Sequence, residues 1–468
     1  MNNKFLYKDA SKISSAVRKG EVSAREITES FLQRAITLND KYNCFSQFLS
    51  SRALKEADKV DAIIERGGDP GVLAGVPYGV KNLFDVEGVT TLAGSVMYKD
   101  NPAAEKDATV IKRLQRSGAV LIGTLHMSEF AYGYTNENSH YGPVKNPHDI
   151  TRVSGGSSGG SGSSVAAGMV SFSLGSDTNG SIRLPAALCG VFGFKPTYGS
   201  LSRFGTKMFA SSFDHVGPLA RSVEDIATAF DAMCGTDPYD PVCHGGNDVS
   251  LVSSLNQKID DLRLASLDGY FKNNGSDESY ESVDHVCKAL NITNSVKISN
   301  TDSARGAAFV ITHCEGGLEH ENDIRNNIDK FDPTTRAGFI TGTLLPANWY
   351  VKAQKFRSWY RSQVLNIFND FDILLAPATP FSATKIGQKT MKLDGSDVPV
   401  LSNLGIYAQP LSFIGLPILS VPIHGIGGMP HGVQLITAPG KESSLIKIAS
   451  YLENEGICIA PIANGAVK

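Results

Sequence analysis

Hydrophobic positions along the chain form two alternating kinds of segment, amphipathic stretches and short continuous apolar runs. The first kind has the spacing of a helix, and the second is typical of a buried strand. Residues 23–38 begin with the capping box Ser23-Ala-Arg-Glu26 and continue as an amphipathic helix. Residues 119–123, Ala-Val-Leu-Ile-Gly, form one of the apolar runs. This alternation predicts an α/β fold with a largely parallel sheet.

The same pattern predicts further elements along most of the chain. Helices are expected near 51–66, 107–118, 223–234, 279–290, 303–320, 349–371 and 443–454. Buried strands are expected at 262–266, 372–376, 418–423 and 432–437, and another ends at Lys81. No internal repeat or sharp change of composition divides the chain. We therefore expect one domain over residues 1–468, with an N-terminal helical segment over about 1–68 and a surface excursion over about 235–260.

Charge and cysteine usage exclude several classes of protein. The chain has 44 basic and 47 acidic residues, so it lacks the positive charge that nucleic-acid binding requires. It contains no apolar run of transmembrane length and no apolar core of a signal peptide, so we expect a cytoplasmic protein with no membrane contact. Its seven cysteines are scattered and never spaced C-x-x-C, which argues against a disulfide framework or a metal site. No cofactor is predicted.

Two glycine- and serine-rich stretches, residues 155–164 and 175–185, carry the candidate chemistry. Such composition is most often a flexible linker, but the segment between them enters the core as a small-residue helix and a strand. No Gly-Lys-Ser/Thr follows the glycines, which excludes a phosphate-binding P-loop. Gly155-x-Ser157-x-Gly159 fits the nucleophile elbow, yet it lacks the preceding hydrophobic strand. Closely approaching amides beside a hydroxyl suit acyl transfer instead.

Lys81 ends a predicted buried strand, where lysine is seldom tolerated. It could extend its amine to solvent from the strand end. Alternatively, burial lowers the pKa of a lysine, and a neutral amine is a competent base for a serine nucleophile. Cys189 is the one cysteine beside a glycine-rich loop, and it lies in an apolar run typical of packing. Sequence spacing alone does not bring Lys81 to either serine-rich loop.

Three motifs together resemble the amidase signature family. They are Gly155-Gly-Ser-Ser-Gly-Gly-Ser, Gly175-Ser-Asp-Thr-x-Gly-Ser-Ile-Arg and Phe192-Gly-Phe-Lys-Pro-Thr197. The likeness continues through Gly75-Val-Pro-Tyr-Gly-Val-Lys-Asn and Ala376-Pro-Ala-Thr-Pro380 and covers nearly the whole chain. It implies a single large α/β/α domain around a mixed β-sheet.

The resemblance also implies a Ser–Ser–Lys triad. Ser181 aligns with the nucleophile, Ser157 with a bridging serine on a cis peptide, and Lys81 with the base. The backbone amides expected to form the oxyanion hole are those of Thr178, Asn179 and Gly180. Asp177 and Arg183 are expected to be structural anchors rather than acid or base.

The neighbours of these motifs point to the substrate. In the glutaminase (A) component of the tRNA-dependent amidotransferase the second loop reads Asp-Thr-Gly-Gly-Ser-Ile-Arg-Gln-Pro, whereas this chain has Asn179 and Leu184 at two of those positions. The loop is more similar to that of biuret-type hydrolases that act on 1-carboxybiuret. Both subgroups have an aspartate where this chain has Gly427 and Gly428.

The resemblance implies that Arg357 grips a substrate carboxylate and that Tyr132 lines the pocket, although a surface salt bridge and core packing explain them too. It also implies homodimerisation within a hetero-oligomer that contains a small helical accessory subunit. We therefore predict an amidohydrolase of a small carboxylated ureide. The alternatives are the glutaminase component of a tRNA-dependent amidotransferase and a non-enzymatic scaffold.

Overall fold

A single sheet runs through the computed structural model, which describes residues 4–246, 250–393 and 395–467. It has eleven strands in these ranges. In spatial order they are β1 (Phe45–Phe48), β3 (Val120–Leu125), β2 (Pro77–Lys81), β6 (Phe172–Asp177), β8 (His215–Ala220), β7 (Phe192–Lys195), β14 (Ile418–Ile423), β15 (His431–Ile436), β11 (Ile373–Pro377), β9 (Leu264–Asp268) and β10 (Ser295–Lys297). Two small hairpins, β4 (Glu137–Asn138) with β5 (Gly142–Pro143) and β12 (Thr390–Leu393) with β13 (Ser396–Pro399), lie outside it.

The sheet is mixed, as the family resemblance implies, and the expectation of a largely parallel sheet is wrong. Strands β3, β2 and β6 are parallel, and so are β11, β9 and β10. Every pairing from β6 through β8, β7, β14 and β15 to β11 is antiparallel, as is β1 on β3. Strands β14 and β15 follow each other through a short loop, which antiparallel pairing permits and parallel pairing does not. The apolar runs that predict the strands do not encode this order.

The helices are distributed over the whole chain. They are α1 (Ala10–Arg18), α2 (Ala24–Tyr42), α3 (Ser50–Glu65), α4 (Thr109–Arg116), α5 (Gly159–Ala166), α6 (Arg183–Cys189), α7 (Val223–Met233), α8 (Asp277–Ala289), α9 (Thr301–Glu319), α10 (Glu321–Asn327), α11 (Arg336–Leu344), α12 (Ala347–Ile367), α13 (Val400–Asn403), α14 (Gln409–Ser412), α15 (Glu442–Asn454) and α16 (Asn464–Val467). The 3₁₀ helices are η1 (Lys4–Tyr7), η2 (Val96–Tyr98), η3 (Glu129–Ala131), η4 (Val252–Ser254), η5 (Gly269–Lys272) and η6 (Ile328–Lys330).

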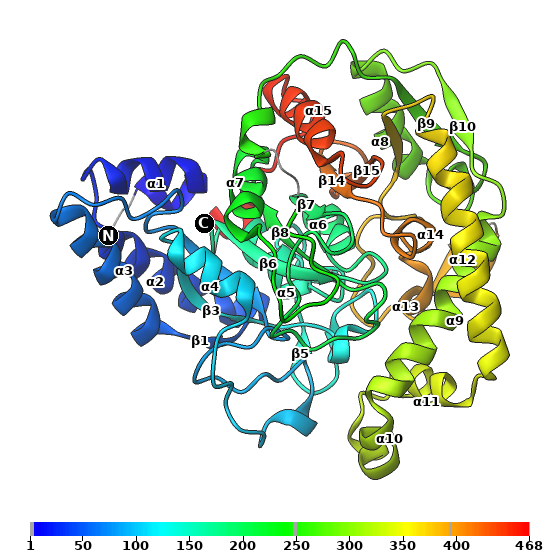
Figure 1. Ribbon diagram of the computed structural model, residues 1–468, viewed down its shortest axis with the longest axis horizontal. Coiled ribbons are helices and arrows are strands. Elements are labelled where there is room, and N and C mark those ends of the chain that lie inside the picture. The colour runs from blue at the N-terminus through cyan, green and yellow to red at the C-terminus, as the bar shows by residue number, and fades with distance from the viewer. Residues whose placement is uncertain (1–3, 247–249, 394, 468) are drawn as a thin grey trace.

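Helices cover both faces of the central strands. Helices α5 and α6 pack on each other, and α6 packs on β7, β14 and β15. Helices α7 and α15 also pack on each other, and they contact β7, β8 and β14. Two helix pairs cannot occupy the same part of one face, so they lie on opposite faces of the sheet. Figure 1 shows α1, α2 and α3 at one end of the molecule and α9 and α12 at the other.

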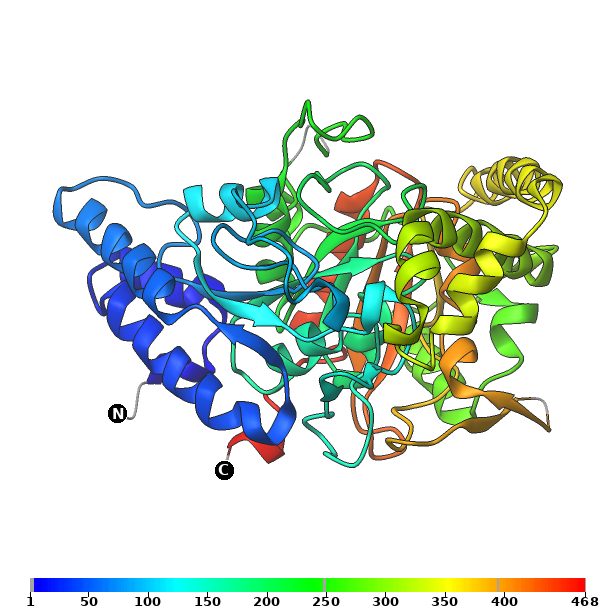
Figure 2. The same cartoon turned by 90° about the horizontal axis from the view of Figure 1, so that it is seen from below.

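Both chain ends lie beside the N-terminal helices, as Figures 1 and 2 show from two directions. Arg34 in α2 donates to the carbonyl of Ala466, and Lys41 donates to that of Gly465. The capping box at Ser23 and Glu26 is present, which explains why α2 begins where the sequence predicts.

Some elements differ from the prediction. Helix α12 ends at Ile367 rather than Phe371, and the N-terminal segment contains strand β1. The sequence pattern does not predict α6, β7 and β8, which are fully buried and lack an amphipathic pattern. Of the excursion expected over 235–260, residues 247–249 lie outside the described residues.

Candidate active site

Lys81 is fully buried at the carboxyl end of β2. Its Nζ donates to Ser157 Oγ at 2.6 Å and to Ser176 Oγ at 2.8 Å. Strand β2 pairs in parallel with β6, whose last residues include Ser176, so the carboxyl ends of both strands meet here. The structure therefore joins the predicted base to the first serine-rich loop across 76 residues of sequence.

The environment of Lys81 favours its neutral form. Burial lowers the pKa of Lys81 to about 7, and the negative charges of Asp214 and Asp177 oppose this shift. An amine with this pKa is largely unprotonated just above neutral pH and can accept a proton from a hydroxyl.

Ser157 is fully buried on a tight loop that leads into α5. The Gly156–Ser157 peptide bond is cis. A Cβ at Gly156 would lie 2.7 Å from the carbonyl oxygen of Gly133 and 2.9 Å from the amide nitrogen of Asn136. Any larger residue at 156 would displace backbone, so the glycine keeps Ser157 next to Lys81.

Ser181 lies on the second loop, between β6 and α6. The Ser158 amide donates to the carbonyl of Ser181 at 3.3 Å, which holds the two serine-rich loops together. Before Ser181, Gly180 has a φ of +122°, and a Cβ there would lie 2.3 Å from Leu184 Cδ1. The hydroxyl of Ser181 makes no hydrogen bond with any described residue, so the expected link from Ser157 to Ser181 is not formed in this state.

The backbone amides around Ser181 differ from the expected oxyanion hole at one position. Gly180 N–H donates to Asp177 Oδ1 at 2.7 Å, because the Asp177 carboxylate folds back over the loop. The amides of Thr178, Asn179 and Ser181 make no hydrogen bond within the described ranges. These three donors, rather than Gly180, are available to an oxyanion.

Asp177 and Arg183 form a fully buried ion pair, with Arg183 Nε 2.9 Å and Nη2 3.0 Å from the carboxylate oxygens. Arg183 also donates to Gln434 on β15 at 2.6 Å and to Ser412 on α14. The pair holds the pKa of Asp177 well below its usual range, although burial opposes this. It ties the loop of Ser181 to the centre of the sheet and to α14.

A cavity of about 140 Å³ opens beside Ser181. Tyr132, predicted to line the pocket, does so, and its hydroxyl lies 2.9 Å from His313 Nε2. The remaining lining residues are Ala131, Gly133, Tyr134, Thr178, Asn179, Phe209, Phe309, Thr312, His313, Pro399, Leu401, Ser402 and Gln409. Ser402 and Gln409 of this set have no role predicted from the sequence, because no local pattern marks them.

Arg357 does not lie in this cavity. Its guanidinium donates to the carbonyls of Ser212, at 2.8 Å, and Phe413, and it stacks over the ring of Phe213. These contacts hold the Arg357 side chain of α12 against the protein interior. In this arrangement the guanidinium is occupied by backbone oxygens, and its contact with a substrate carboxylate stays a prediction.

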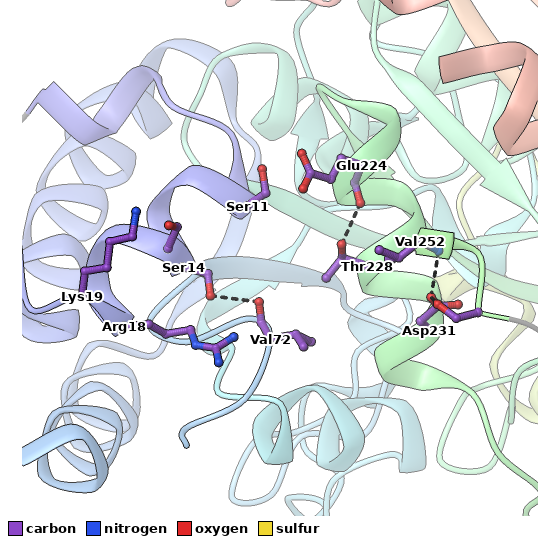
Figure 3. Close-up of a pocket in the computed structure, with 11 residues that line it drawn as sticks. Ser11, Ser14, Arg18, Lys19, Val72, Glu224, Thr228, Asp231 and Val252 are labelled. Atoms are coloured by element: carbon purple, nitrogen blue, oxygen red, sulfur yellow. Dashed lines mark hydrogen bonds between the residues drawn. The ribbon is translucent and has the colours of Figure 1, made fainter. Parts of the chain in front are cut away.

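A larger cavity, of about 590 Å³, lies between α1 and α7 (Figure 3). Its hydroxyls are used for structure: Ser14 donates to the carbonyl of Val72, and Thr228 to that of Glu224. Lys19 and Arg18 line it, but among the described residues no side-chain hydrogen bond joins either of them to a serine, and Arg18 forms an ion pair with Asp69. This cavity lacks the base and hydroxyl pairing found at Lys81.

The comparisons with known proteins identify the family of the chain. A family model described as amidase matches residues 26–446. The chain belongs to the amidase signature family, and it is an amidase that hydrolyses amide C–N bonds.

Individual relatives show which members of the family the chain is similar to. The chain is 47% identical to AtzE, a subunit of the 1-carboxybiuret hydrolase of Pseudomonas sp. (strain ADP), over 95% of this chain and 98% of that protein. It is 34% identical to the A component of the glutamyl-tRNA(Gln) amidotransferase of Coxiella burnetii, over 96% and 97%. A solved structure described as a vestigial protein complex that reveals the evolutionary origins of an s-triazine catabolic enzyme superposes with a TM-score of 0.95 at 46% identity, covering 97% of this chain and 100% of that one.

Two further features bear on partners. No helix in the described ranges is long and apolar enough to cross a bilayer. No group of three or more His, Cys, Asp or Glu side chains in those ranges could hold a metal ion.

Proposed function

We propose that the chain is an amidohydrolase of a small carboxylated ureide, 1-carboxybiuret, and that Lys81, Ser157 and Ser181 form its catalytic triad. The observation that carries the proposal is the 2.6 Å hydrogen bond from Lys81 Nζ to Ser157 Oγ, beside a cavity lined by Ser181. The identity of 47% to a protein of 1-carboxybiuret hydrolase supports the substrate.

The mechanism follows from these positions. Neutral Lys81 accepts the proton of Ser157, which takes the proton of Ser181 as Ser181 Oγ attacks the carbonyl carbon. The carbonyl oxygen becomes an oxyanion and accepts hydrogen bonds from the amides of Thr178, Asn179 and Ser181. The proton then returns through Ser157 to the departing nitrogen, the C–N bond breaks, and ammonia leaves. Water attacks the acyl-enzyme by the same relay and restores Ser181.

The size of the cavity supports a small substrate. Pockets that hold drug-sized ligands measure roughly 300–1,000 Å³, whereas this one measures about 140 Å³. Aromatic side chains of Tyr132, Phe209 and Phe309 line it. A long acyl chain or peptide would require these rings to move, whereas a ureide of about ten non-hydrogen atoms would not.

We also propose that the enzyme works in the cytoplasm, with a small helical accessory subunit, and pairs with a second copy within that assembly. All seven cysteines are free, which is typical of a reducing compartment. The assembly is supported by the solved relative described as a protein complex. Light scattering on the purified chain, alone and mixed with a candidate small subunit, measures how many copies associate. A chain that stays monomeric in both samples contradicts this part of the proposal.

Ammonia release from 1-carboxybiuret, biuret and glutamine tests the proposed function. We expect release from the ureides, greatest from 1-carboxybiuret, and its loss in Ser181→Ala. Release from glutamine alone would favour the amidotransferase glutaminase, to which the chain is 34% identical. Undiminished hydrolysis by Ser181→Ala would remove the proposed mechanism.

A further inference from the structure

Polar side chains also line the cavity beside Ser181, among them Ser402 and Gln409 at the start of α14, and together these two are called the polar wall here. Arg305 of α9 lies against this wall. Its Nε donates to Gln409 Oε1 at 2.9 Å, and its Nη2 donates to Asn403 Oδ1 at 2.6 Å and to the Ser402 carbonyl at 3.1 Å.

Every one of these acceptors is uncharged. No Asp or Glu forms an ion pair with Arg305 in the part of the chain that the structure describes. Its charge nevertheless reaches the cavity: burial raises the pKa of Tyr134, a lining residue, and the charge of Arg305 opposes that rise. A half-buried cation without an ion-paired acid contributes a positive potential to this end of the cavity.

Arg305 also fixes how the Gln409 amide is turned. A guanidinium only donates hydrogen bonds, so the oxygen of Gln409 must face Arg305 and the NH₂ group must point away from it. The side chain is 6% exposed, and its Nε2 has no hydrogen-bond partner among the described residues. The cavity wall therefore carries a pre-positioned, unused N–H donor.

This donor lies beside the reacting loop. Ala408, which precedes Gln409, has its Cβ 2.8 Å from the place where a Cβ on Gly180 would lie. Gly180 in turn precedes Ser181, and both Ser181 and Gln409 line the same small cavity. A ligand that fills the cavity can thus contact both.

We propose that Gln409 binds the carboxylate of the substrate and that Arg305, acting through Gln409 and by its unpaired charge, makes the site select an anionic amide. This inference rests on the proposed function, because it assigns one end of the ureide to Gln409 while the other presents its amide carbonyl to Ser181. The wall formed by Ser402 and Gln409, unlike Arg357, lines this cavity, and Arg305 is a positioning residue.

The first test is binding to a Ser181→Ala enzyme, measured by isothermal titration calorimetry. The ligands are 1-carboxybiuret and triuret, which has a neutral carboxamide in place of the carboxylate. We expect the anion to bind at least about tenfold more tightly, and Arg305→Met to remove about tenfold to one-hundredfold of its affinity, the range for a lost hydrogen bond to a charged group. Triuret binding should change by no more than about twofold.

Two matched variants interpret the result. Gln409→Met keeps the length of the side chain but removes the N–H donor. It should weaken binding of the anion as much as Arg305→Met does. Arg325→Met removes an arginine whose side chain is 70% exposed on α10 and should leave both affinities unchanged. Equal loss of anion and triuret affinity in Arg305→Met would overturn the inference, because it would show that Arg305 only supports the wall.

Turnover separates this inference from the proposed function. With the catalytic serine restored, Arg305→Met should raise KM for the anion and leave kcat within about twofold. A wild-type enzyme that hydrolyses no ureide would refute the proposed function, yet malonamate and malonamide, which also differ only in carboxylate against carboxamide, still measure the charge preference. A wild-type enzyme that prefers malonamide would overturn the role of Arg305 and Gln409.

Discussion

Two lysines are fully buried at the carboxyl ends of sheet strands, Lys81 on β2 and Lys195 on β7. Burial lowers the pKa of each to about 7, and in Lys195 the charge of Arg183 adds to the effect. By burial and pKa alone the two are equivalent. They differ in what their ammonium groups contact.

Lys81 donates to two serine hydroxyls, and one of them lies on the loop beside Ser181. Lys195 donates to the carbonyls of Pro196, at 3.3 Å, and Leu416, and it lies 3.2 Å from His215 Nε2. A carbonyl has no proton to give, so Lys195 has nothing to activate.

His215 extends the structural role of Lys195. Its Nδ1 lies 3.1 Å from the Asp177 carbonyl, which can only accept, so Nδ1 carries the proton and Nε2 accepts from Lys195. The chain from Lys195 through His215 thus supports the end of β6. A lowered lysine pKa marks burial, and the partner's chemistry decides whether the amine is a base.

The largest effect that separates the two lysines is expected from Lys81→Met. Removing the base should lower kcat/KM by about 10²–10⁴-fold, the usual contribution of general-base catalysis. Ammonia release under saturating and limiting substrate measures this loss. Unchanged thermal unfolding would show that the fold survives, and activity within tenfold of wild type would contradict the role of Lys81.

The pH dependence of kcat/KM should be the next largest effect. The base must be neutral, so activity is full above the Lys81 pKa of about 7 and falls as pH drops through it. At pH 5 the neutral fraction, and hence kcat/KM, is about one-hundredfold below the plateau. If Lys195→Met shows the same fall of kcat/KM at low pH, the titrating group is Lys81. If the fall disappears in that variant, the titrating group is Lys195 instead.

Lys195→Met should change stability more than chemistry. The substitution leaves the carbonyls of Pro196 and Leu416 and His215 Nε2 without a donor. We expect unfolding free energy to fall by about 1–3 kcal/mol and kcat/KM to fall by less than about tenfold. Urea denaturation and steady-state kinetics on one preparation measure both. A loss of activity as large as that of Lys81→Met would break the distinction.

The smallest effect is expected from Ser176→Ala. Ser176 is the second hydroxyl that accepts a hydrogen bond from Lys81, and its removal leaves the Ser157 contact in place. We expect kcat/KM to fall by about threefold to tenfold, as for one hydrogen bond of about 1 kcal/mol. Ser157→Ala is the matched comparison, and a larger loss for Ser176→Ala would reverse the order of the two hydroxyls in the relay.

The hydrophobic pattern predicts helices and strands that are amphipathic or continuously apolar, such as α2 and β3. It does so because the burial of one face, or of a whole strand, determines which residues occupy neighbouring positions of the sequence. It did not predict the antiparallel centre of the sheet. Pairing order depends on which strands meet, and this is not a property of any one segment.

The site divides in the same way. Lys81 stands out because it ends an apolar run, and Ser157 and Ser181 stand out because they lie in glycine-rich loops. Arg305 and Gln409 meet across 104 residues, so no window of sequence links them. The role of Arg357 comes from the family resemblance, which does not reveal the backbone carbonyls that its guanidinium contacts in this structure.

The central claim, that Ser181 is the nucleophile activated through Ser157 by Lys81, is tested most directly by covalent labelling. Methanesulfonyl fluoride is small enough for a cavity of about 140 Å³, and intact mass with peptide mapping locates its adduct. We predict one sulfonyl group per chain on Ser181, slowed in Lys81→Met and absent in Ser181→Ala. A label on another residue, or full labelling of Ser181→Ala, would contradict the account.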